Sequence, residues 1–140
     1  MALPAHLTLE IVTPERALAH EQVDEVQIPG ADGYFDVLPG HTPLLASLQV
    51  GELWYRRGAE KQYLSVAFGF AEVLPDRVTI LARIGERAED IDVVRAEEAK
   101  RRAQDALSRR PADVDLELAR VSLLKALVRL QVAGRARTRG

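Results

Sequence analysis

Short apolar–polar alternations fill the first 85 residues of the chain and predict β-strands. Segments of roughly period two, rich in Val, Ile and Leu, lie at residues 7–12, 23–28, 52–56, 62–67, 70–74 and 78–82. Turn signals such as Thr13-Pro14, Pro39-Gly40 and Pro75-Asp76 separate several of them. Many short strands at this spacing are typical of a sandwich or barrel, and we expect almost no helix before residue 86.

The pattern changes at Glu86, where a helix is predicted. Gly and Pro are absent from Glu86 to Arg110, while Ala, Glu, Lys and Arg favour a helix that we place at residues 90–108, with Asp90 or Asp92 as its N-cap. Its inner side should consist mostly of alanine and comprise Ile91, Val94, Ala99, Ala103, Ala106 and Leu107. Because alanine is small, a second helix can approach this side closely.

A second helix should follow directly. Pro111 ends the first helix, because proline disfavours helical geometry in the residue before it. Asp113 and Asp115 are the candidate starts of a helix that runs to about Val132, with Gly134 as its stop. So short a connection predicts an antiparallel hairpin. The expected fold is therefore α+β, with an N-terminal β-sandwich of short antiparallel strands at residues 1–86 and a C-terminal antiparallel two-helix hairpin at residues 87–140.

The second helix carries two apolar stripes. One comprises Leu116, Ala119, Leu123, Ala126, Leu127 and Leu130, and the other, about 150° away, comprises Val121, Leu124, Val128 and Val132. The first stripe is sufficient to pack against the first helix. The second either covers the β domain in a resting form or docks on another protein, and both hold if the hairpin has two positions.

Charge is distributed unevenly along the chain. Residues 1–85 carry 6 basic and 11 acidic side chains, whereas residues 86–140 carry 13 and 10, and no acidic residue follows Leu118. A basic end on an acidic body indicates an anionic partner, or else a solvated helix face with a basic tail. Nucleic acid is the poorer candidate for that partner, because no aromatic side chains are interleaved with the basic ones.

The sequence contains no recognisable catalytic or metal-binding pattern. It has no cysteine, and the three histidines, His6, His20 and His41, lack metal-ligand spacing. There is no P-loop and no Gly-x-Ser-x-Gly elbow. The N-terminus lacks the features of a signal peptide, and no apolar run reaches the ~18 residues of a membrane span. We therefore expect a non-catalytic protein that is soluble or at most peripheral.

Short motifs along the chain carry a family resemblance. They are Val12-Thr-Pro-Glu-Arg16, Pro29-Gly30 with Gly33, Val37-Leu-Pro-Gly-His-Thr-Pro-Leu-Leu45, Gly69-Phe-Ala-Glu-Val73, Val78-Thr-Ile-Leu-Ala82, Ile91-Asp-Val-Val-Arg-Ala96 and Arg129-Leu-Gln-Val132. The Leu-Pro-Gly-His-x-Pro-Leu block, some fifty residues ahead of Ile-Asp-x-x-Arg-Ala, is the most specific combination. Over essentially its full length the chain resembles the epsilon subunits of bacterial F-type ATP synthases, called delta in mitochondria.

The resemblance implies a central-stalk (rotor) subunit that couples proton flow to ATP synthesis. Its β-sandwich would contact the gamma subunit and the c-ring, at the cytoplasmic face of the bacterial plasma (inner) membrane. Its hairpin would either fold down or extend into the catalytic head, where it meets the alpha and beta subunits and inhibits ATP hydrolysis. The residues expected to make inhibitory contacts are Arg120, Val121, Leu124, Lys125, Val128 and Arg129.

The resemblance also implies ATP as a regulatory ligand of the folded hairpin, with no obligatory cofactor and no metal. The family motif Ile/Leu-Asp-x-x-Arg-Ala is matched by Ile91, Asp92, Arg95 and Ala96, and further matching positions are Glu86, Arg102, Lys125 and Arg129. The four basic side chains would converge on a polyphosphate, although Lys125 offers a point charge where the best binders have an arginine fork. The alternative for Asp92 and Arg95 is an exposed ion pair on a helix, worth ~0.2–0.5 kcal/mol.

One departure from the family pattern concerns residues 33–41, which we expect to form a loop. The residues expected to contact the rotor and c-ring here are Tyr34, Leu38, Pro39, Gly40 and His41. The family usually has Gly-Glu-Leu/Phe-Gly where this chain has Gly33-Tyr-Phe-Asp36, so Tyr34 cannot supply the glutamate charge. Asp36 would replace a left-handed glycine, a conformation that Asp tolerates better than most residues.

A function of another class also fits the residues. The same hairpin would serve a free-standing adaptor protein that binds an unrelated partner. Co-purification with a gamma subunit separates the two interpretations.

Overall fold

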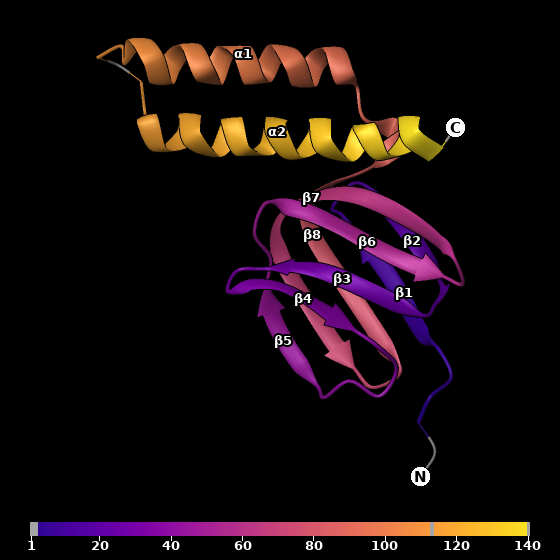
Figure 1. Ribbon diagram of the computed structural model, residues 1–140. Helices are drawn as coiled ribbons and strands as arrows, with labels where there is room; N and C mark the ends of the chain where they lie inside the picture. Colours follow the sequence, from indigo (N-terminus) through magenta and orange to yellow (C-terminus); the bar gives the residue numbers. More distant parts are fainter. Residues whose placement is uncertain (1–2, 113, 140) are drawn as a thin grey trace. The chain divides into compact units, whose positions relative to one another are not determined.

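The computed structural model describes residues 3–112 and 114–139, with side chains as far as residue 136. The chain divides into two compact units, Met1–Arg87 and Ala88–Gly140. We call them the β unit and the helical unit. Figure 1 shows the strands of the former and the paired helices of the latter.

The β unit is a sandwich whose strands are hydrogen-bonded into one continuous, folded sheet. In chain order the strands are β1 (Leu7–Val12), β2 (Ala17–Val23), β3 (Glu25–Gly30), β4 (Gly33–Val37), β5 (Leu44–Ser47), β6 (Gly51–Arg57), β7 (Glu60–Leu74) and β8 (Arg77–Arg87). Their order in the sheet is β2-β1-β8-β7-β6-β3-β4, and β5 pairs with β7. All the pairs are antiparallel except β1–β8, which is parallel.

The long strand β7 changes partners halfway along its length. Its first half pairs with β6 as far as Val66, and its second half pairs with β5 from Phe70 onward. Between these halves Phe68 and Gly69 have φ angles of 62° and 116°. A Cβ at Gly69 would collide with the carbonyl oxygen of Leu81. Only glycine fits here, and this turn of the backbone lets one strand serve both layers of the sandwich.

The core lies between the layers and follows the period-two pattern of the sequence. Leu7, Leu9 and Ile11 of β1 are fully buried, and the residues between them are only partly buried. Tyr55 is the largest fully buried side chain. Alternate apolar positions of the other long strands fill the same space, so burial of apolar surface is the main stabilising term.

The helical unit begins with a short 3₁₀ turn, η1 (Ala88–Asp90), followed by α1 (Val93–Arg109) and α2 (Leu116–Arg139). Arg110 ends α1 in a left-handed conformation, with φ 48° and ψ 58°, directly before Pro111. At the start of α2 the Asp115 carboxylate accepts hydrogen bonds from the backbone N–H groups of Glu117 and Leu118, at 3.0 and 3.2 Å. The helices run antiparallel, as the short connection predicts (Figure 1).

Some expectations need correction. Helix α2 does not stop at Gly134 but continues to Arg139, because one glycine costs only about 1 kcal/mol in a helix whose neighbours are good helix formers. Val94 does not lie on the inner side of α1, since 67% of it is exposed. Residues 33–37 form strand β4 rather than a loop, and Asp36 is extended, not left-handed. Asp113, the other candidate start of α2, lies outside the described residues.

The sequence did not predict strands β2, β4 and β5, and it divided β7 into two. Strand β4 contains Gly33 and Asp36, which disfavour strands, and β5 has only four residues. These segments are held by pairing with neighbours, for example Val26↔Val37 in β3–β4. Their own propensity would not form a strand.

Candidate functional site

Small residues line the seam between α1 and α2. Ala96 of α1 is 0% exposed, and Ala103, one heptad later, is also buried. On α2, Ala119, Ala126 and Ala133 repeat the same spacing and are all buried. Because alanine projects only a methyl group, the two backbones approach closely while little apolar area is buried.

The predicted Ile-Asp-x-x-Arg-Ala motif forms the start of α1. Asp92 is the N-cap, and its carboxylate accepts a hydrogen bond from the backbone N–H of Arg95 at 3.1 Å. Ile91 is buried, and Ala96 faces the seam. Within the described residues the Asp92 carboxylate caps the helix and makes no side-chain ion pair with Arg95.

The four predicted cations lie along one edge of the hairpin. At about 100° per residue, Arg95 and Arg102 flank the α1 seam on one side, and Lys125 and Arg129 flank the α2 seam on one side. In an antiparallel pair these two flanks form the same edge. We call these four residues the basic rim.

Two members of the basic rim have exposed, uncommitted side chains. Arg95 and Arg102 are exposed, and among the described residues neither side chain makes a hydrogen bond or an ion pair. Lys125 and Arg129 are partly buried and do have partners. The rim therefore presents two guanidinium groups whose donors are available to an anion.

A groove opens along the hairpin where Arg102 lies. It has a volume of about 390 Å³, and its lining includes Ala99, Arg102, Ala106, Leu118 and Ser122. The small seam residues Ala103 and Ala119 also line it. The groove is shallow and mostly apolar, and its lining also includes the Asp115 side chain at the start of α2.

Glu86 is the one predicted ATP residue outside the helical unit. It lies in β8, where it is paired in register with Ser65 of β7. The other seven predicted residues, Ile91, Asp92, Arg95, Ala96, Arg102, Lys125 and Arg129, all belong to the helical unit.

The residues predicted to make inhibitory contacts all lie on α2, but their exposure differs. Leu124 is 45% exposed, and Arg120 is exposed and pairs with Glu117 at 3.4 Å. Val121, Lys125, Val128 and Arg129 are partly buried, and Val132 of the second stripe is fully buried. The second stripe is thus not open along its whole length.

The structure places the predicted rotor-contact residues at two separate points of the β unit. Tyr34 lies near the start of β4, where its hydroxyl oxygen accepts a hydrogen bond from the backbone N–H of Glu52 at 3.1 Å. Leu38, Pro39, Gly40 and His41 follow the end of β4, about 13 Å further along an extended chain. The Gly40 N–H donates to Pro75 at 2.7 Å, and the His41 side chain donates from Nδ1 to the Thr42 carbonyl at 2.6 Å.

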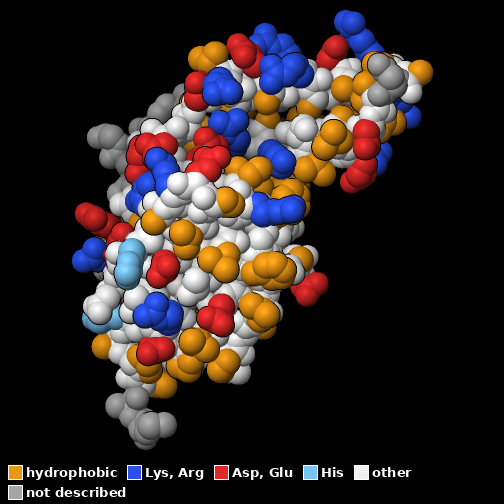
Figure 2. Space-filling view, turned by 180° about the vertical axis from the view of Figure 1, so that it is seen from behind, with side chains coloured by type: hydrophobic (Ala, Val, Ile, Leu, Met, Phe, Trp, Pro, Cys, Tyr) orange, Lys and Arg blue, Asp and Glu red, His pale blue; other side chains and the backbone are white. Residues whose placement is uncertain are grey.

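An apolar patch that the sequence did not reveal lies on the outer face of the β unit. Phe70 and Leu81, paired neighbours on β7 and β8, are each 54% exposed, and Leu45 of β5 is also exposed. They adjoin a groove of about 710 Å³ that is otherwise lined mainly by apolar residues and by Arg83. Figure 2 shows hydrophobic side chains gathered on one face of the β unit. An exposed patch of this kind marks a protein-binding surface.

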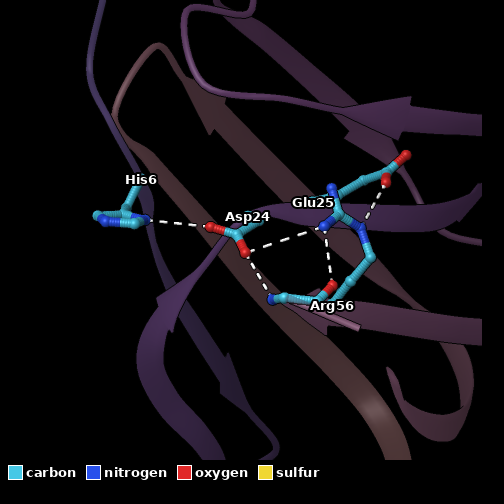
Figure 3. A network of polar contacts seen from close by, with 5 residues as sticks. His6, Asp24, Glu25 and Arg56 are labelled. Atoms are coloured by element: carbon cyan, nitrogen blue, oxygen red, sulfur yellow. Dashed lines mark hydrogen bonds and ion pairs between the residues drawn. The ribbon is translucent and has the colours of Figure 1, made fainter. Parts of the chain in front are cut away.

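A polar network that the sequence did not reveal ties the start of β1 to the β2–β3 turn (Figure 3). Asp24 accepts a hydrogen bond from the Gly58 N–H at 2.7 Å and contacts His6 Nδ1 at 3.1 Å. Arg56 pairs with Glu25 at 3.0 Å and approaches Asp24 at 3.9 Å. The Gly58 N–H, followed by His6, lowers the pKa of Asp24 below its ordinary value of 3.8. The network holds together the start of β1, the β2–β3 turn and strand β6.

Over the described residues, no group of three or more His, Cys, Asp or Glu side chains is arranged to hold a metal ion. In the same residues, neither α1 nor α2 is long and apolar enough to cross a membrane.

Comparison with known families matches nearly the whole chain. Residues 6–88 match the family described as "ATP synthase, Delta/Epsilon chain, beta-sandwich domain", and residues 89–134 match "ATP synthase, Delta/Epsilon chain, long alpha-helix domain". These matched ranges correspond closely to the two structural units. Both parts of the predicted fold, the sandwich and the helical hairpin, are thereby confirmed.

Individual proteins show the same relationship. An ATP synthase epsilon chain of Syntrophotalea carbinolica is 48% identical over 130 residues, which are 92% of this chain and 94% of that protein. The epsilon chain of Geobacter sulfurreducens is 44% identical over 93% of this chain and 95% of its own length. A solved chain in the Euglena gracilis mitochondrial ATP synthase (OSCP/F1/c-ring) superposes with a TM-score of 0.81 at 25% identity, covering 95% of this chain and 84% of that chain.

Proposed function

The chain belongs to the ATP synthase delta/epsilon family, and on that premise we propose that it is a rotor subunit whose helical unit senses ATP. In this role the β unit holds the chain on the central stalk, and the hairpin adopts a folded, ATP-binding form or an extended, inhibitory form. The chain itself carries out no catalysis. Its place is at the cytoplasmic face of the bacterial inner membrane, as a peripheral part of the synthase that couples proton flow to ATP synthesis.

The observation that carries the ATP proposal is the basic rim beside an alanine seam. Arg95 and Arg102 are exposed and make no ion pair among the described residues, so they can form forked hydrogen bonds with phosphate oxygens at no cost in broken contacts. Asp92 fixes the first turn of α1 and so directs Arg95. Binding of one polyanion along the rim would bridge α1 and α2. Since the seam buries little apolar area, such a bridge changes the stability of the folded hairpin appreciably.

Thermal unfolding with increasing ATP tests this proposal. ATP should raise the unfolding temperature, and Arg95→Ala should remove most of the increase. Arg101→Ala is a matched control, because Arg101 is an equally exposed arginine on α1 outside the basic rim. If millimolar ATP gives no shift in the unsubstituted chain, the hairpin does not sense ATP.

We further propose that the gamma subunit covers the apolar patch around Phe70 and Leu81. Phe70 and Leu81 line an apolar groove, and exposed apolar surface of this kind favours a protein partner over open solvent. Phe70→Asp with Leu81→Asp should abolish co-purification with gamma, while His20→Asp, on an exposed position of β2, should not. Retention of gamma by the doubly substituted chain would mean that the gamma interface lies elsewhere on the β unit.

We propose a c-ring contact at the turn Leu38–His41, with a second contact at Tyr34.

Inhibition of ATP hydrolysis is the proposed role of α2 in the extended form. Its exposed Leu124 and its basic residues suit an acidic, partly apolar groove formed by the alpha and beta subunits. Truncation after Arg87 should leave a folded β unit that still assembles, while ATP hydrolysis by the complex rises. The cut belongs after Arg87 because β8 extends to that residue. Unchanged hydrolysis would remove the inhibitory role.

A further inference from the structure

The groove beside Phe70 and Leu81 is apolar along most of its length and charged at one position. Arg83 is the one charged residue among those that line it in the part of the chain that the structure describes. Most of the other lining residues are apolar. All of them belong to the β unit, so the groove lies within a single unit. A positive charge in such a groove gives this surface a sign as well as a shape.

Arg83 shares the outer face of β8 with Leu81. The two residues are exposed, whereas Ala82 between them is buried, as the alternation of a strand requires. Within the described residues the Arg83 side chain makes no hydrogen bond and no ion pair. Its guanidinium donors are therefore available to a group that enters the groove.

Phe68 of β7 lines the same groove in an unfavourable backbone conformation. Its φ of 62° is left-handed, which is rare for a bulky residue. The pairs Ala67↔Ile84 and Gly69↔Ala82 flank it in register, so Phe68 lies opposite Arg83. Residues in such conformations persist only where the surrounding structure holds them, and they cluster at binding sites. Phe68 is thus kept in the groove lining at a cost in stability.

A partner that covers the groove would remove water from the Arg83 guanidinium. An unpaired charge in an apolar contact is costly, so the partner must supply an acceptor at this position. A carboxylate is the best acceptor, because it neutralises the charge and matches the forked geometry of the guanidinium. The apolar lining in turn requires an apolar side chain next to that carboxylate.

We propose that this groove determines the specificity of the gamma interface, and that it binds a gamma segment whose apolar side chain lies next to a carboxylate paired with Arg83. This inference rests on the gamma interface proposed above. Phe68 and Leu81 provide the apolar contact. Arg83 discriminates against segments that bring no charge or a positive charge to this position.

Binding to a head complex of alpha, beta and gamma subunits that lacks this chain tests the proposal. Association and dissociation rates would be measured by surface plasmon resonance for the full-length chain and its variants. Arg83→Ala should weaken binding by roughly 10- to 100-fold, the loss expected for a hydrogen bond to a charged group. Arg83→Glu should weaken it further, because two carboxylates would meet. Arg83→Lys, which keeps the charge but not the fork, should fall between Arg83→Ala and the unsubstituted chain.

Charge reversal identifies the partner residue. Each acidic residue of gamma would be changed to lysine in turn and tested against Arg83→Glu. One of these changes should restore binding by Arg83→Glu and weaken binding by the unsubstituted chain, because directly paired residues show an interaction energy of their own. If none of the reversals restores binding, the proposed pair does not exist.

Two variants separate recognition from folding. Arg77→Ala removes another exposed arginine of β8, which approaches Glu10 at 4.0 Å and is not part of the groove lining, so it should leave binding unchanged. Phe68→Gly relieves the left-handed backbone, so urea unfolding should show little loss of stability. The same change removes the ring from the groove and should weaken binding by roughly tenfold. Lower stability with unchanged binding would mean that Phe68 has only a structural role, contrary to the proposal.

The possible failures differ. If Phe70→Asp with Leu81→Asp abolishes gamma binding while Arg83→Ala binds as tightly as the unsubstituted chain, the gamma interface stands and this inference is overturned. If the doubly substituted chain retains gamma, both proposals fail. Self-association of the free chain that Arg83→Glu abolishes, measured by analytical ultracentrifugation, would show that a second copy occupies the groove and would also overturn the inference.

Discussion

Enlarging one alanine of the helical seam should open the hairpin and leave the β unit unchanged. Ala126 is 1% exposed, and on α2 it lies on the same side as Ala119 and Ser122, which share the groove with α1. Ala126→Leu adds three carbon atoms at this buried position. Overpacking of this kind costs typically about 1–3 kcal/mol, equivalent to roughly a 5–150-fold change in the opening equilibrium.

Amide hydrogen exchange measures this change for each unit separately. In Ala126→Leu, amides of α1 and α2 should exchange faster by about the same 5–150-fold, because exchange from the native state reports the local opening equilibrium. Core amides of β1 and β7 should keep their protection, since they belong to the other unit. ATP should bind more weakly, because the folded hairpin that binds it is less populated.

Gln131→Leu provides the matched control. It introduces the same side chain into the same helix at an exposed position, so it should leave helix exchange nearly unchanged. The reasoning would be refuted if Ala126→Leu left α1 and α2 as protected as before, or if the β unit lost protection equally. The first result would mean that the seam has room for a larger side chain. The second would mean that the two units unfold together.

Three further substitutions test other parts of the structure. Gly69→Ala should destabilise the β unit by at least about 1–3 kcal/mol, measured by urea unfolding, because its Cβ would collide with the Leu81 carbonyl oxygen at positive φ; unchanged stability would contradict this. The pKa of Asp24 is lowered in the folded state, so its contribution is present above its unfolded value near 3.8 and is lost as pH falls through the folded value. Asp24→Asn should therefore lower stability at pH 6 and flatten the loss of stability below pH 4, and an acid transition identical to that of the unsubstituted chain would contradict it. Asp92→Ala should destabilise the helical unit by about 0.5–2 kcal/mol, seen as faster exchange in the first turn of α1; unaltered exchange there would mean that the cap contributes little.

Much of the fold could be predicted because local rules and tertiary structure agree. Strand β1 begins and ends where the alternation predicted, since Leu7, Leu9 and Ile11 must share one face. Pro111 and Asp115 set the hairpin connection through backbone chemistry that needs no distant partner. Strands β4 and β5 could not be predicted, because their residues become strands only when β3 and β7 offer partners.

The candidate site, too, could be predicted from the sequence only in part. The motif residues Asp92 and Arg95 could be identified from the sequence, because a helix start is recognisable locally. That Arg95 has no ion-pair partner among the described residues, and that Arg87 meets Tyr55 and Leu18, could not be foreseen. Those contacts join residues 32 and 69 positions apart in the chain.

By itself the sequence determined the class of the fold, the division near residue 87 and the chemistry available on each helix, because periodicity, proline and capping act over a few residues. Only the tertiary structure decided which strands pair, which apolar side chains are left exposed around Phe70 and Leu81, and how the last residue of β8 is fixed. The physical reason is that pairing and burial depend on surfaces brought together from distant parts of the chain, as the parallel pairing of β1 with β8 shows.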